Sequence, residues 1–147
     1  MDGPAARRSA LVDRLTPPRW YHPAQGGALA LLVASFATGT PPLVVAALVT
    51  YLVALNHLPK AYRRATGVWL AGEPPPTTRR WARGLAATAF GAVFVGAVCL
   101  SNDAPVLALI VAGLAYALVQ VLGRRFDTEL RARLREDPDV FHLIEEA

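Results

Sequence analysis

The strongest structural signal in the chain runs from Trp81 to Arg125 and reads WARGLAATAFGAVFVGAVCLSNDAPVLALIVAGLAYALVQVLGRR. It contains two apolar runs, 82–100 and 105–122, joined by a short polar link. Arginines stand at both outer ends, and Asp103 is the only charge between Gly84 and Gly123. A membrane-spanning helix needs about 20 predominantly apolar residues. The stretch therefore predicts a helical hairpin that crosses a bilayer and returns.

The first half of the chain follows the same plan. Apolar runs at 23–38 and 42–58 flank a turn rich in Gly and Pro, the residues that most often break helices. Two basic signatures recur 61 positions later: Arg19-Trp20 as Arg80-Trp81, and Arg63-Arg64 as Arg124-Arg125. Two interpretations stay open. Either the chain contains a parallel internal repeat, or two unrelated hairpins each need such anchors.

The run at 23–38 is short for a membrane span, because about 17 residues is the lower limit. Trp20 and Tyr21 at the interface would complete it. The alternative is a cleaved signal peptide with its cut site near Ser35-Phe36-Ala37. A second apolar run follows Pro41-Pro42 at once, which favours the hairpin.

Charge and apolar sequence are strongly separated along the chain. Hydrophobic residues make up 54% of the 147 residues and charged residues 18%, against about 25% charged in soluble domains. No charge lies between Gln25 and Leu55. A charge at mid-membrane costs about 2.5–3.5 kcal/mol on the insertion scale. The separation therefore indicates an integral membrane protein.

The basic residues predict its orientation. Of the 15 Lys and Arg residues, four precede Tyr21, six lie between Leu58 and Gly84, and five follow Leu122. The turns within the two hairpins contain none. Because cytoplasmic loops carry the excess of Lys and Arg, both termini and the central link should be cytoplasmic. The Ala-, Arg- and Pro-rich composition favours a high-GC bacterium, and so a bacterial inner membrane.

Together these patterns predict an all-α integral membrane protein with four transmembrane helices in two hairpins, followed by a short C-terminal cytoplasmic helix. The expected segments are a cytoplasmic N-terminal segment 1–19, a first hairpin 20–58, a cytoplasmic link 59–80, a second hairpin 81–123, and a cytoplasmic helix and acidic tail 124–147. Tryptophan prefers the membrane–water interface. The expected membrane anchors are Trp20, Trp69 and Trp81.

Small residues recur every four positions in the apolar runs, which gives each helix a flat face. Close approach through such faces drives helix association in lipid. The expected packing residues are Gly26, Ala30 and Ala34 in the first run and Gly84, Thr88, Ala92 and Gly96 in the third. They predict either a tight four-helix bundle or hairpins that pack in an oligomer.

Polar residues gather at the cytoplasmic ends of the runs and form the best candidate site. With nearby arginines they predict a layer that binds the phosphate of an anionic lipid. The candidate residues are His22, Gln25, Asn56, His57 and Gln120, with Arg63, Arg64, Arg80 and Arg124. The simpler interpretation is that polar residues stand where the bilayer becomes wet and hydrogen-bond between helices.

Signals for catalysis, metals and cofactors are absent from the sequence. Cys99 is the only cysteine, and the histidines have no further ligand at metal or haem spacing. Catalytic and nucleotide-binding motifs are missing, as are nucleic-acid-binding modules. We therefore expect no metal, no cofactor and no nucleic-acid partner, and we leave enzymatic activity uncertain but not favoured.

The C-terminal tail differs from the rest of the chain. Residues 136–147 contain five acidic residues and no basic ones. Three interpretations stay open: the tail docks on a partner protein, folds back onto the basic central link, or is a frayed terminus.

These observations favour a protein of the cell membrane that acts by assembly, as an accessory or scaffold subunit or as a homo-oligomer. Its expected partners are anionic membrane lipids and either another protein or a second copy. The alternatives are a small oligomeric transporter or channel, and a lipid-binding or lipid-modifying enzyme that uses the polar layer. A transporter usually needs a charged or polar group inside the bilayer, and the apolar runs contain no such charge.

Overall fold

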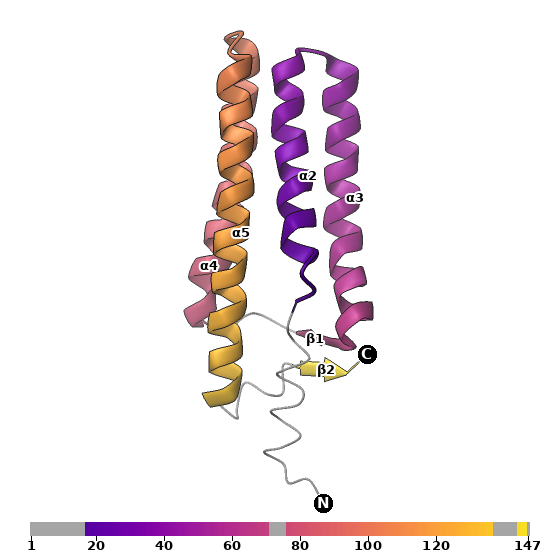
Figure 1. Ribbon diagram of the computed structural model, residues 1–147, viewed down its shortest axis with the longest axis vertical. Coiled ribbons are helices and arrows are strands. Elements are labelled where there is room, and N and C mark those ends of the chain that lie inside the picture. The colour runs from indigo at the N-terminus through magenta and orange to yellow at the C-terminus, as the bar shows by residue number, and fades with distance from the viewer. Residues whose placement is uncertain (1–16, 71–75, 137–143, 147) are drawn as a thin grey trace, which may run out of the picture.

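A computed structural model describes residues 17–70, 76–136 and 144–146. Its elements are α2 (Tyr21–Ser35), the 3-10 turn η1 (Phe36–Thr38), α3 (Pro41–Thr66), β1 (Val68–Leu70), α4 (Pro76–Ser101), α5 (Pro105–Glu136) and β2 (Ile144–Glu146). The four helices run along one common axis (Figure 1). The described part is thus overwhelmingly helical, and α3, α4 and α5 are each long and apolar enough to cross a membrane.

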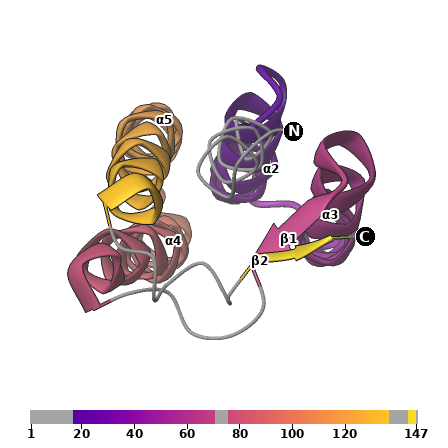
Figure 2. The same ribbon diagram turned by 90° about the horizontal axis from the view of Figure 1, so that it is seen from below.

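Helix α2 is the shortest and the most enclosed of the four. Its 15 residues span about 22 Å at 1.5 Å per residue. The three residues of η1 add about 6 Å, which brings the unit close to the hydrocarbon thickness of about 30 Å. In the view along the bundle, α2 lies between α5 and α3 (Figure 2). It is therefore shielded from the surroundings by its neighbours.

The core lies where α2, α4 and α5 meet. Its buried members are Leu29, Val33, Ala92, Ala112, Ala115 and Val119. Glycines make room for side chains of neighbouring segments: a Cβ on Gly96 would lie 2.6 Å from the Phe36 ring, and one on Gly26 would lie 3.1 Å from the Tyr116 ring. Gly84 faces Leu122 of α5. The small faces of α2 and α4 thus point into the molecule.

Apolar side chains cover the outside of the bundle. Phe90 is 80% exposed and Phe94 is 70% exposed, and large aliphatic side chains of α3 and α5 are exposed in the same way. Soluble monomers rarely expose apolar patches of more than a few hundred Å². An apolar surface around the helices is what a membrane protein requires.

The helices extend beyond the boundaries expected from the apolar runs. Helix α3 continues through Pro59 to Thr66, and α4 begins at Pro76 instead of Trp81. The link expected at 59–80 is therefore helical at both ends. Pro59 removes one backbone hydrogen bond from α3. The helix nevertheless continues, and Tyr62 in its next turn packs on Tyr21 with ring centroids 5.2 Å apart.

The C-terminal region continues the last helix and then returns to the central link. Helix α5 runs without a break from Pro105 to Glu136, so the C-terminal helix expected from the sequence is continuous with the fourth apolar run. Strand β2 pairs with β1 in antiparallel register, with Trp69 opposite Glu145. The end of the tail therefore folds back onto the central link, one of the three alternatives. The rest of the N-terminal segment and of the tail, residues 1–16, 137–143 and 147, lies outside the described part.

Candidate functional site

The first turn of α2 contacts the polar end of α5, which is the C-terminal part of that helix from Arg124 to Glu136. Pro17 and Pro18 precede α2, and the Tyr21 N–H donates to the Pro18 carbonyl at 2.9 Å. This turn places His22 against α5, where it is only 8% exposed. Its Nε2 is bonded to the Asp127 carboxylate. The contact joins residues 105 positions apart, at the point where the apolar part of α5 has ended.

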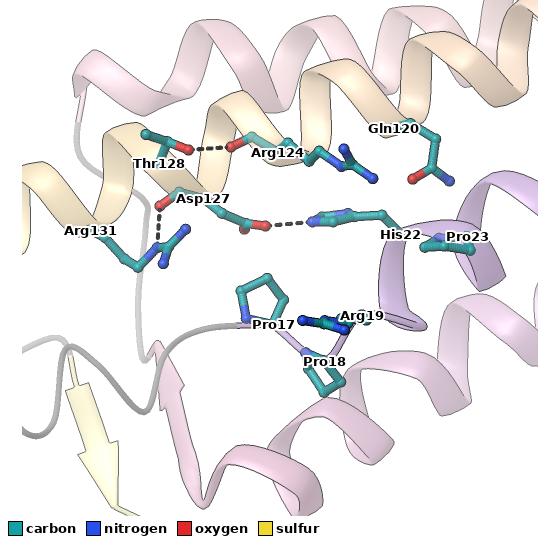
Figure 3. Close-up of a pocket in the computed structure, with 10 residues that line it drawn as sticks. All are labelled: Pro17, Pro18, Arg19, His22, Pro23, Gln120, Arg124, Asp127, Thr128 and Arg131. Atoms are coloured by element: carbon teal, nitrogen blue, oxygen red, sulfur yellow. Dashed lines mark hydrogen bonds and ion pairs between the residues drawn. The ribbon is translucent and has the colours of Figure 1, made fainter.

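A cavity of about 470 Å³ opens beside this pair. Figure 3 shows its lining, which comes from the start of α2 and from one face of α5. The lining residues are Pro17, Pro18, Arg19, His22, Pro23, Gln120, Arg124, Asp127, Thr128 and Arg131. Three of them are arginines and one is an acid. The cavity is therefore an electropositive pocket.

Two polar groups in the pocket wall are buried without partners. Both Oε1 and Nε2 of Gln120 lack a hydrogen bond in the described part of the chain, as does His22 Nδ1. Such groups are rare in proteins, because burying an unpaired polar atom costs about 1–3 kcal/mol.

A glycine of α5 makes room for the His22 ring. A Cβ on Gly123 would lie 2.7 Å from His22 Cε1 and closer still to Nδ1. One ring nitrogen thus contacts Asp127 and the other faces the α5 backbone. In this arrangement the imidazole joins two helices and forms a wall of the pocket.

The structure brings only part of the expected polar layer together. His22, Gln120 and Arg124 meet at the pocket, whereas Gln25 is half-buried outside its lining. Asn56 and His57 are exposed on α3, so they do not join the layer. The reason is helical periodicity: the half-buried side of α3 carries Tyr51, Ala54, Leu58 and Tyr62, and at 100° per residue positions 56 and 57 turn away from it.

The other expected arginines lie elsewhere. Arg63 and Arg64 are exposed in the last turn of α3. Arg80 donates from Nη2 to both carboxylate oxygens of Glu129, at 3.0 and 2.7 Å, and Trp81 Nε1 donates to the same carboxylate at 2.6 Å. These bonds fasten the start of α4 to the polar end of α5.

The tryptophans expected as anchors have different surroundings. Trp20 is 44% exposed just before α2, and its ring centroid lies 6.1 Å from that of Tyr21. Trp81 is half-buried and donates to Glu129, and Arg80 lies over its ring at 5.0 Å from the centroid. Trp69 is in β1. Trp20 and Trp81 both lie near the polar end of the bundle, the end that carries the pocket.

Sequence reasoning missed Asp127, Arg19 and Arg131 as members of the site. A signal was present: Gln120, Arg124, Asp127 and Arg131 are spaced by four, three and four residues. That spacing places all four on one helix face. The apolar stripe that includes Leu130 is on the same segment and is more obvious in the sequence.

The arrangement suits the binding of an anion better than the binding of a metal. Guanidinium groups bind phosphate and carboxylate oxygens. Within 17–70, 76–136 and 144–146, no three His, Cys, Asp or Glu side chains are grouped to hold a metal ion. Comparisons with protein-family models, curated proteins and solved structures find no match to this chain.

Proposed function

We propose that the chain crosses the inner membrane of a bacterium four times, as two helical hairpins with both termini in the cytoplasm. Three helices have the necessary length and apolarity, and the α2–η1 unit is about 28 Å long by helix geometry. The positions of the 15 basic residues support the orientation. A short central helix suits this topology, because a helix enclosed by protein does not have to match the lipid thickness by itself.

Within the membrane, we propose that the protein acts by assembly, either with a second copy or as a subunit of a complex. One observation carries this proposal: α3 packs mainly on α2 and leaves the bundle open on that side (Figure 2). Ala47, which is 6% exposed, is the only residue of α3 that is buried. A helix with one helical neighbour has most of its surface available for contacts with other chains.

The open side also contains a groove suited to a helix. A cavity of about 360 Å³ lies between α2 and α3. Its wall includes six small residues: Ala34, Ser35, Thr38, Ala46, Ala47 and Thr50. Small residues let helix backbones approach closely in lipid, where van der Waals packing is a main source of association energy. An incoming transmembrane helix could therefore pack deeply here.

Native mass spectrometry of the tagged protein, extracted from its own membrane in mild detergent, tests the assembly. We expect a homo-oligomer or a stoichiometric complex with another membrane protein. Ala46→Phe should dissociate it, because the exposed Ala46 lines the groove and the new ring would fill it. Ala117→Phe is the matched control, since Ala117 is exposed on α5 away from the groove.

A monomer in the unaltered protein would contradict the proposal. Equal dissociation by Ala117→Phe would also contradict it, because general disturbance of the apolar surface would then explain the loss. Melting temperatures of both variants provide the folding control, and each should stay near that of the unaltered protein.

The transporter alternative has less support. It needs polar groups through the membrane, whereas the cavity between α4 and α5 is lined mainly by Ala, Gly, Val and Leu. The groove between α2 and α3 contains hydroxyl groups, but Ser35, Thr38 and Thr50 donate to carbonyls of their own helical segments.

A further inference from the structure

The pocket between α2 and α5 has the chemistry of a binding site. Arg19, Arg124 and Arg131 face it, and the one acid, Asp127, is bonded to His22. Positive charge in the lining therefore exceeds negative charge. The N-terminus of α2 lies at the same place and has no acidic residue in its first turn, so its dipole adds further positive potential.

Two of these arginines have side chains available for a ligand. In the described part of the chain, the guanidinium groups of Arg19 and Arg124 form no ion pair or hydrogen bond, and both residues are exposed. Arg131 differs from these two arginines because its guanidinium group already has a partner: Nε donates to the Asp127 carbonyl at 3.2 Å. In Figure 3 the Arg124 side chain extends toward Gln120, and Arg19 lies across the pocket from Asp127.

Gln120 contributes an unpaired amide to the same pocket lining. Its side-chain nitrogen and oxygen are buried and unpaired, although the residue is part of the pocket wall. The Gln120 amide and two unpaired guanidinium groups belong to one pocket lining, which suits a ligand with several acceptor oxygens on one centre. A phosphate group has that form, and guanidinium groups bind it with paired hydrogen bonds.

The pocket also lies where the apolar surface of α5 ends. The apolar part of α5 ends at Leu122, and Arg124 follows immediately. Exposed apolar side chains continue along α5 as far as Val121. A group bound at Arg124 would therefore lie where hydrocarbon gives way to headgroups in the proposed topology.

We propose that this pocket binds a phosphate ester through Arg19, Arg124 and Gln120. The source is either the headgroup of an anionic lipid, with its acyl chains against the apolar surface, or a soluble phosphate compound. This site involves different residues from the α2–α3 groove, so it does not depend on the proposed assembly.

Thermal unfolding of the full chain, followed by tryptophan fluorescence, tests the site. The protein is placed in nanodiscs of phosphatidylcholine with or without phosphatidylglycerol, and separately in detergent with or without inorganic phosphate. We expect an anionic ligand to raise the melting temperature. In Arg19→Gln/Arg124→Gln, the apparent affinity should fall about tenfold or more, as expected when two charge-assisted contacts are lost.

Arg63→Gln/Arg64→Gln is the charge-matched control, because both side chains are exposed at the end of α3 outside the pocket. This control variant should keep the rise in melting temperature that the ligand causes. A rise with phosphatidylglycerol alone identifies a lipid headgroup, and a rise with inorganic phosphate as well identifies a soluble phosphate ester. No rise with either ligand would overturn the proposal. Equal loss of the rise in melting temperature in both double variants would also overturn the proposal, because diffuse surface charge would then explain that rise.

Discussion

His22 is held at two points by α5, and both contacts depend on single residues. Asp127 binds its Nε2, and Gly123 allows the ring to lie directly against the helix backbone. A histidine that is 8% exposed and held in this way joins the start of α2 to α5. His22 and Asp127 also line the pocket, so the pocket wall depends on this junction.

Gly123→Ala should therefore destabilise the protein. The added methyl group would overlap the His22 ring, and overpacking of this kind costs about 1–3 kcal/mol. Gly113→Ala is the control on the same helix, because a Cβ there meets nothing within 4 Å. Replacing a helical glycine by alanine in open space is neutral or gains up to about 1 kcal/mol. Melting temperatures in detergent should fall for the first variant only. A fall of the same size in Gly113→Ala would contradict the expectation.

The sequence predicted where polar residues gather better than it predicted which of them lie together. The boundary between apolar and basic sequence indicated where polar groups should gather, and His22, Gln120 and Arg124 do meet there. Asn56 and His57 do not join them, because proximity along the chain does not fix the rotation of α3. The role of Asp127 could not be recognised without knowing that the start of α2 packs against it.

Helix ends are stabilised by contacts that lie beyond the apolar runs. Glu129 accepts hydrogen bonds from Arg80 and from Trp81 Nε1, and Leu130 is buried. Tyr62 packs on Tyr21 at the end of α3. Such tertiary contacts explain why α3 and α5 continue into polar sequence. Hydrophobic periodicity predicted that the helices exist, but it could not predict contacts that extend their ends.

Glu129→Gln should weaken the junction of α4 and α5. The amide loses the charge that attracts Arg80 and one of its acceptor oxygens. We expect the melting temperature to fall by a few degrees at low ionic strength, and we expect high salt to reduce the difference because salt screens exposed ion pairs. Asp103→Asn removes the same charge in the turn before α5 and should have little effect. If the difference in melting temperature did not change with salt, the contact between α4 and α5 at Glu129 would not be electrostatic.

The whole molecule is an open arrangement of helices around α2. Helices α4 and α5 pack on one side of α2, and α3 lies on the other (Figure 2). The sequence predicted either a tight four-helix bundle or hairpins that associate in an oligomer. Small residues occur in every run, and their spacing alone could not show which faces would meet inside one chain. The position of α3 favours association.

In the proposed topology α2, although short, crosses the membrane. Cysteine labelling in spheroplasts tests it directly, in a Cys99→Ser background with single cysteines at Arg19, Thr40, Asn102 and Arg125, all of which are exposed. A membrane-impermeant maleimide should label Thr40→Cys and Asn102→Cys from outside, and Arg19→Cys and Arg125→Cys only after permeabilisation. Labelling of Arg19→Cys from outside together with Thr40→Cys would contradict the claim, because α2 would then lie on one side and only three helices would cross.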